Sequence, residues 1–71
     1  MTLNELLTTL AENEGLNVEV VETVSEADNV IIDFDASGYE ALSAELLARE
    51  VEKVTINSQS SIVIGITIKV I

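Results

Sequence analysis

The chain has 71 residues, which is enough for one domain (1–71) and too short for a second. It contains no cysteine and no histidine, which excludes disulfides, thiolate catalysis, cysteine-based zinc sites and the commonest general base. Thirteen acidic residues against three basic ones give a formal net charge of −10, which disfavours direct contact with nucleic acid or an anionic membrane.

The charge is unevenly distributed along the chain. Residues 1–48 hold eleven of the acids and none of the three bases. A stretch of this kind attracts basic protein surfaces, although a small aliphatic domain also needs charge to stay in solution. Both interpretations remain open from composition alone.

The first predicted element is a helix over residues 3–13. Thr2 followed by Glu5 forms a capping box, in which each side chain accepts a hydrogen bond from a backbone N–H of the first turn. The leucines that follow fall on one face at helical spacing, and Gly15 supplies the C-terminal stop. We therefore expect an amphipathic helix that packs its leucines inward.

Two strands are predicted after this helix. Apolar and polar residues alternate over 16–21 and again over 30–35, which is typical of half-buried strands. The segment between them, 23–29, is polar and is predicted to be a hairpin loop.

A second helix is predicted from Ser37 to about Arg49. Ser37 and Glu40 repeat the capping-box spacing, and apolar residues recur after them at helical intervals. Those apolar residues are Tyr39, Leu42, Leu46 and Leu47. Because each half of the chain opens with such a box, an internal duplication is one interpretation, and a coincidence of short elements is the other.

Two further strands end the chain. Val54 and Ile56, with Val51 near the start, predict a third strand; a turn follows over 57–61, and 62–71 forms a long final strand. The order αββαββ predicts a two-layer α+β fold with a mainly antiparallel four-stranded sheet and both helices on one face. The predicted core consists of Leu6, Leu10, Val18, Val20, Ile32, Phe34, Leu42, Leu46, Val54, Ile56, Ile64, Ile66 and Ile68.

The final strand also predicts apolar surface on the uncovered face of the sheet. If its even-numbered residues face the helices, Val63 and Ile71 face outward, where Val21 and Ile31 join them. Uncovered apolar sheet surface is typical of self-association, but scattered exposed aliphatic side chains are also ordinary on monomers. A homodimer or larger assembly through these four residues is therefore an open expectation.

One segment resembles the opening of a calcium-binding loop. Asp33, Asp35 and Ser37 supply oxygens at alternate positions, and Gly38 permits the tight turn that follows. The pattern breaks at Ala44, where such a loop needs a bidentate glutamate. A strand end with a helix cap is the favoured interpretation, so no metal or other cofactor is expected.

Catalysis is not expected. Paired carboxylates perform acid–base chemistry only in a cleft that raises the pKa of one of them, and the sequence indicates no cleft. The serines and threonines have no histidine to activate them, and the three glycines are isolated rather than gathered in a phosphate-binding loop. A cytoplasmic location is expected, because the start lacks a signal peptide and no segment is long and apolar enough to span a bilayer.

The acids of the first two strands and their loop are predicted to gather in one patch if those strands pair. The candidate partner-binding residues are Glu19, Glu22, Glu26, Asp28, Asp33 and Asp35. Such a patch suits a basic protein surface, and it also imitates the regularly spaced phosphates that DNA- and RNA-binding proteins recognise. The alternative is that these acids have no binding role and only form the solvated polar face of the sheet.

Residues 42–56, LSAELLAREVEKVTI, combine a leucine-spaced helix with an Arg-Glu-Val step into a strand. With the opening residues 1–7 and the apolar final strand, they resemble short uncharacterised proteins encoded by phages and prophages of Gram-positive bacteria. The resemblance covers most of the chain and implies no established activity. It implies an accessory phage protein in the host cytoplasm that binds a host or viral protein, a class that includes small acidic inhibitors of host defence.

We therefore predict a non-catalytic protein-binding module that uses an acidic surface against a basic partner of unknown identity. Three alternatives from other classes stay open. One is a nucleic-acid mimic that inhibits a host DNA- or RNA-binding protein, another is a structural or self-assembling protein, and the third is a calcium-binding domain.

Overall fold

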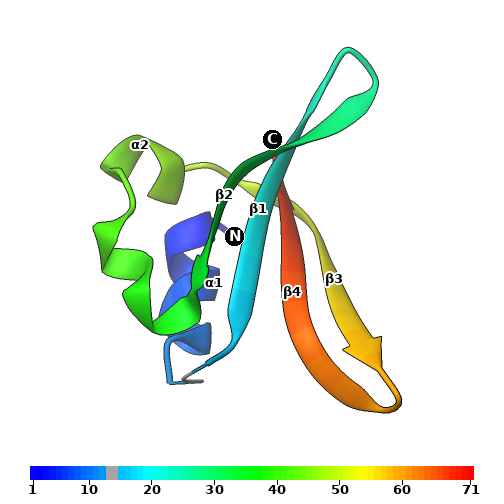
Figure 1. Ribbon diagram of the computed structural model, residues 1–71. Coiled ribbons are helices and arrows are strands. Elements are labelled where there is room, and N and C mark those ends of the chain that lie inside the picture. Colours follow the sequence, from blue (N-terminus) through cyan, green and yellow to red (C-terminus); the bar gives the residue numbers. More distant parts are fainter. Residues whose placement is uncertain (13–14) are drawn as a thin grey trace.

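The sheet is built from two β-hairpins whose inner strands lie side by side (Figure 1). β1 (Asn17–Val24) pairs antiparallel with β2 (Ala27–Asp35), and β3 (Val51–Gln59) pairs antiparallel with β4 (Ile62–Val70). β1 and β4 run parallel, so the described residues form a small α+β fold with a four-stranded mixed sheet of order β2-β1-β4-β3. The computed structural model describes residues 1–12 and 15–71, and the side chains of two β4 residues, Val63 and Ile64, lie outside that description.

The helical elements are short. α1 (Leu3–Leu10) precedes the first hairpin, and the 3-10 helix η1 (Ala36–Ala41) and α2 (Ala44–Leu47) connect β2 to β3. In Figure 1 all three lie on the same side of the sheet. Because β2 and β3 are the two edge strands, this connection crosses the whole width of the sheet.

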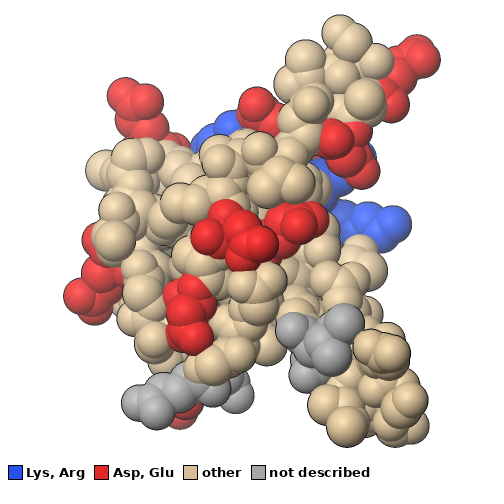
Figure 2. Space-filling view, in the orientation of Figure 1, with Lys and Arg blue, Asp and Glu red and all other residues tan. Residues whose placement is uncertain are grey.

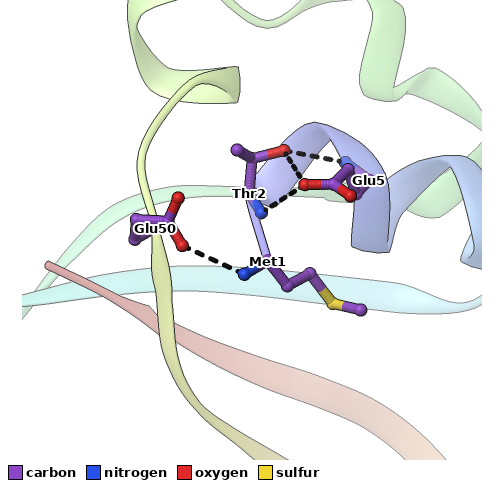
Figure 3. A network of polar contacts seen from close by, with 4 residues as sticks. All are labelled: Met1, Thr2, Glu5 and Glu50. Atoms are coloured by element: carbon purple, nitrogen blue, oxygen red, sulfur yellow. Dashed lines mark hydrogen bonds and ion pairs between the residues drawn. The ribbon is translucent and has the colours of Figure 1, made fainter.

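The start of α1 is fixed by the predicted capping box (Figure 3). The Thr2 hydroxyl oxygen accepts a hydrogen bond from the Glu5 N–H at 3.2 Å, and Glu5 Oε1 accepts one from the Thr2 N–H at 3.0 Å. The Met1 amine lies 3.0 Å from Glu50 Oε2, and Thr2 forms an isolated bridge with Glu50, which ties this end to the start of β3. The helix ends at Leu10, earlier than predicted.

The prediction of one continuous second helix capped by Ser37 is wrong. Leu42 is extended, with φ −73° and ψ 153°, and separates η1 from the single turn of α2. Asp35 caps η1 by accepting the Ser37 N–H at 3.0 Å, and Ser43 caps α2 by accepting the Leu46 N–H at 3.2 Å. Asp and Ser side chains that bind nearby backbone N–H groups favour helix starts over helix interiors, and two of them interrupt this segment.

Both hairpins close in two-residue turns, much shorter than the predicted loops. Ser25 and Glu26 have φ of 51° and 68°, and Ser60 and Ser61 have φ of 52° and 68°. Positive φ at both central residues is the type I′ geometry, which matches the twist of a hairpin. The polar residues assigned to loops at 23–29 and 57–61 therefore lie mostly within the strands.

The core lies between α1, η1 and the two inner strands. Its members are Leu3, Leu7, Val18, Val20, Ala36, Leu42, Ile66, Ile68 and Val70. Five predicted core residues are among them, and five more pack against it half-buried: Leu6, Leu10, Ile32, Phe34 and Leu46. Leu3 and Leu7 lie on the leucine face of the predicted first helix and Val70 is an even-numbered residue of the last strand, while the burial of Ala36 was not predicted.

The predicted burial of Val54 and Ile56 is wrong. They are 44% and 62% exposed, although their cross-strand partners Ile68 and Ile66 belong to the core. The helical layer therefore covers the inner strands and leaves edge strand β3 bare. Ile64, also predicted in the core, has a side chain outside the described set.

Candidate functional site

Three of the predicted partner-binding acids lie together on the face of the sheet opposite the helices, which we call the outer face. Side chains alternate along a strand, so Glu19 faces outward between the buried Val18 and Val20. The register places Asp33 directly opposite Glu19, and Asp35 opposite Asn17 two positions along. We call Glu19, Asp33 and Asp35 the outer acidic cluster.

Glu19 and Asp33 carry like charges at directly paired positions. Within the described part of the chain, neither carboxylate has a hydrogen bond or an ion pair. Like charges directly opposite each other on adjacent strands are destabilising. In Figure 2 a group of acidic side chains lies near the middle of the view, over β1 and β2, and no basic side chain lies within that group; the basic side chains are seen farther toward the top and the right. This pair therefore costs the fold stability and leaves charge available to a partner.

Asp35 has a structural role in addition to its charge. Its Oδ1 accepts hydrogen bonds from the Ser37 hydroxyl at 2.7 Å and from the Ser37 N–H at 3.0 Å. These bonds hold the pKa of the Asp35 carboxyl below its ordinary value, and the bond from the Ser37 hydroxyl contributes more than the bond from the N–H. Asp35 therefore stays ionised while it caps η1.

The other three predicted acids lie apart from the outer acidic cluster. Glu22 Oε2 lies 2.8 Å from Arg49 Nη1, and Asp28 Oδ1 lies 3.5 Å from Lys69 Nζ. Glu26 is at the exposed tip of the β1–β2 hairpin. The structure thus divides the six predicted residues into a cluster of three, two that are paired with bases, and one at a turn. Their role in binding stays a prediction.

Nothing among the described residues is arranged as a metal centre, since no three His, Cys, Asp or Glu side chains gather suitably there. One oxygen of Asp35 is already bound by Ser37. A shallow open hollow of about 340 Å³ lies between the start of α1 and α2. Its lining is Thr2, Asn4, Ala44, Leu47 and Ala48, and none of these supplies a titratable side chain.

The four predicted self-association residues differ in exposure. Val21 is 5% exposed, Ile31 37% and Ile71 72%, while the Val63 side chain is outside the described set. Val21 lies beside Lys69 in the β1–β4 register, and the Lys69 ammonium reaches Asp28 on β2. Self-association through these residues stays a prediction.

Sequence reasoning missed a second exposed surface on the β3–β4 hairpin. Val54, Ile56 and Ile62 are 44%, 62% and 66% exposed. A signal was present, because residues 54–68 contain no charged residue in a chain of net charge −10. In Figure 2 the described part of this hairpin lies at lower right and is tan, with neither acidic nor basic side chains at its tip.

A scan against models of known protein families, a search of curated proteins and a search of solved structures each find no match to this chain. None of the helices in residues 1–12 and 15–71 has the length and apolar character needed to cross a bilayer.

Proposed function

We propose that this chain is a non-catalytic protein-binding module whose outer acidic cluster contacts a basic partner. The observation that carries the proposal is the direct pairing of Glu19 with Asp33 on a sheet face. Like charges at such positions destabilise a strand pair. The sheet pairs Lys53 with Lys69 in the same way, but Lys69 lies within 4 Å of carboxylates of Asp28 and Glu52, whereas Glu19 and Asp33 have no ion pair among the described residues. A basic partner that binds this surface would neutralise the two carboxylates and so relieve their repulsion.

The distribution of basic residues supports the same proposal. Arg49 is paired with Glu22, and Lys69 lies within 4 Å of carboxylates of Asp28 and Glu52. These bases therefore neutralise acids outside the outer acidic cluster. A partner that brings lysine or arginine side chains to the cluster meets carboxylates with no competing ion pair among the described residues.

The remaining elements of the proposal come from the sequence. The resemblance to phage-encoded proteins suggests an accessory role in the cytoplasm of an infected Gram-positive cell. The lack of histidine and cysteine favours binding over catalysis. The partner is proposed to be a protein with a basic surface, contacted without direct binding to nucleic acid or membrane.

The test compares three versions of the chain as bait in lysate of a Gram-positive host. The double variant Glu19→Gln/Asp33→Asn removes the facing charges, and Glu12→Gln/Glu40→Gln removes the same charge from exposed positions elsewhere. We expect a partner that wild type and the control retain in low-salt washes, that the cluster variant loses, and that high salt releases. Equal retention by all three baits would contradict the proposal.

Duplex DNA as competitor then separates this proposal from nucleic-acid mimicry. A mimic occupies the nucleic-acid site of its target, so DNA displaces it. If the retained protein binds DNA and DNA competes with the bait, mimicry is the better description. If the partner stays bound in the presence of DNA, the acidic face contacts some other basic surface.

A further inference from the structure

The β3–β4 hairpin differs from the rest of this anionic chain in having no charge over residues 54–68. β3 is an edge strand, so one row of its backbone N–H and C=O groups has no strand beside it among the described residues. Pairing with β4 is regular between Lys53 and Asn57, flanked by register shifts on either side. This regular segment is therefore a template for one more strand.

The opposite edge is protected in the way that natural sheets usually are. β2 carries Asp28, Asp33 and Asp35, and a register shift between Val20 and Val21 leaves Ile31 out of the pairing. Charges and bulges on an edge strand prevent a further strand from adding to it. β3 has no charge and no proline from Val54 to Gln59. β3 also carries Glu52, Lys53 and two register shifts, but between Val54 and Asn57 it has neither a charge nor a shift, and this uninterrupted stretch is what distinguishes it from β2.

β3 also presents apolar side chains that the described helices leave uncovered. Val54 and Ile56 pair with Ile68 and Ile66, so they lie on the helix side of the sheet next to the core. Because Val54 is 44% exposed and Ile56 62% exposed, they form a strip of exposed apolar surface along this edge of the sheet. A strand added there buries these side chains and satisfies the free backbone groups at the same time.

We infer that β3 pairs antiparallel with β3 of a second copy of this chain, around a two-fold axis at Thr55. In this register Val54 of each copy faces Ile56 of the other, and Lys53 faces Asn57. The two sheets then join into one continuous sheet with both helical layers on the same side. The contact is isologous, as in most homodimers, because each copy offers the same strand.

We infer a second copy as the occupant because the uncharged stretch of β3 is complementary to itself, with Val54 facing Ile56, and because it lets two anionic copies meet away from their acids. Two copies, each with a net charge of −10, repel each other where their acidic surfaces come close. At the middle of β3 two copies can meet without bringing acidic residues together. With strands about 4.8 Å apart, the two β2 edges are separated by seven spacings, or about 34 Å. That exceeds the Debye length of about 10 Å at 0.1 M salt, so their repulsion is screened. Glu50 and Glu52, near the start of β3, are already paired with the Met1 amine and Lys69.

The test is sedimentation equilibrium of the full chain over about two decades of concentration in the micromolar range. The average mass of the wild-type protein is expected to rise with concentration from the monomer mass of 7.6 kDa toward twice that mass. Added salt should shift this rise to lower concentration, because it screens the repulsion between the copies. Ile56→Lys should weaken association by at least about tenfold, because it places a charge in the apolar contact. Val30→Lys is the matched control: Val30 is 57% exposed on the other edge, and its variant should associate like wild type.

A monomer at every concentration would overturn the inference, and so would a dimer that Ile56→Lys leaves intact. Hydrogen exchange of the wild-type protein needs no variant: those amides of residues 53–57 that point away from β4 should become more protected as concentration rises, and no change there would also contradict it. This inference uses the edge away from the outer acidic cluster and does not rest on the proposed function. Salt separates the two, because it strengthens this dimer and weakens acid–base binding.

Discussion

Arg49 and Glu22 join the two halves of the chain, with Arg49 Nη1 2.8 Å from Glu22 Oε2 on β1. Arg49 lies between α2 and β3, and its Nε also donates a hydrogen bond to the Ile71 carbonyl oxygen at 2.9 Å. Both members of the ion pair are about one-third exposed, at 32% and 33%, so solvent screens their attraction only in part. This contact connects the helical crossover to the central strands.

Replacing Arg49 with Met should lower the free energy of unfolding by about 1 kcal/mol, from a partly screened ion pair and one hydrogen bond. Urea unfolding of Arg49→Met, Glu22→Gln and the double variant measures the coupling between them. Lys53→Met is the control, since Lys53 has no ion pair within the described residues. If the two single changes are fully additive, the pair contributes nothing to stability.

A substitution in the β3–β4 turn should stabilise the protein. Ser60 and Ser61 both hold positive φ, a backbone region that costs non-glycine residues about 1 kcal/mol each. Asn followed by Gly adopts type I′ turns readily. Ser60→Asn/Ser61→Gly should therefore raise the free energy of unfolding by about 1 kcal/mol, measured by urea unfolding. The same midpoint as wild type would show that this turn is not strained.

Two glycines should respond in opposite ways to alanine. A Cβ at Gly65 would lie 3.1 Å from the backbone oxygen of Asn17 in β1, whereas a Cβ at Gly38 would meet nothing within 4 Å. Gly65→Ala should therefore destabilise by about 1–3 kcal/mol through overpacking between inner strands. Gly38→Ala should be neutral or stabilise by about 0.5 kcal/mol, because it restricts the unfolded chain. Thermal melts of both variants give the comparison, and equal midpoints would contradict the close approach of β1 and β4.

Stability should depend on pH through the two capping carboxylates. The pKa of Glu5 is lowered by the Thr2 N–H and then by the Thr2 hydroxyl, and the pKa of Asp35 is lowered by the Ser37 hydroxyl and N–H. A carboxylate with a lower pKa in the folded state stabilises above its unfolded pKa, and this contribution is lost as pH falls through the folded pKa. The stabilisation should therefore be constant near neutrality and fade below about pH 4.

Urea unfolding of Glu5→Gln and Asp35→Asn at a series of pH values tests this sign. Each variant should be less stable than wild type at neutral pH, and the difference should shrink on acidification. Glu40→Gln is the control, because it loses the same charge without a hydrogen bond among the described residues. A difference that persists unchanged into strong acid would mean that the carboxylates do not cap the helices.

Local signals in the sequence predicted local structure well. The Thr2–Glu5 capping box is a contact between residues three apart, and it was confirmed. The order of the four strands along the chain was also recoverable, because apolar and polar residues alternate within them. The second helix was mispredicted because leucine spacing alone does not reveal that Asp35 and Ser43 each start a separate helical turn.

Long-range arrangement was beyond the sequence. Parallel pairing of β1 with β4 joins residues about fifty positions apart, and no local pattern encodes it. Alternation correctly placed Val54 and Ile56 on the helix side of the sheet, but it does not say how far three short helices extend over that side. The outer acidic cluster was partly foreseen, since Glu19, Asp33 and Asp35 were named, while the pairing of Glu22 with Arg49 was not.

The central claim is that Glu19 and Asp33 repel each other in the free protein and so offer uncompensated charge to a partner. The most direct measurement is low-salt urea unfolding of Glu19→Gln/Asp33→Asn beside Glu12→Gln/Glu40→Gln. Removing the facing pair should raise the free energy of unfolding by about 0.2–1 kcal/mol more than the control does, and added salt should erase the difference. A cluster variant that is no more stable than the control would contradict the claim, because the facing carboxylates would then carry no stored repulsion.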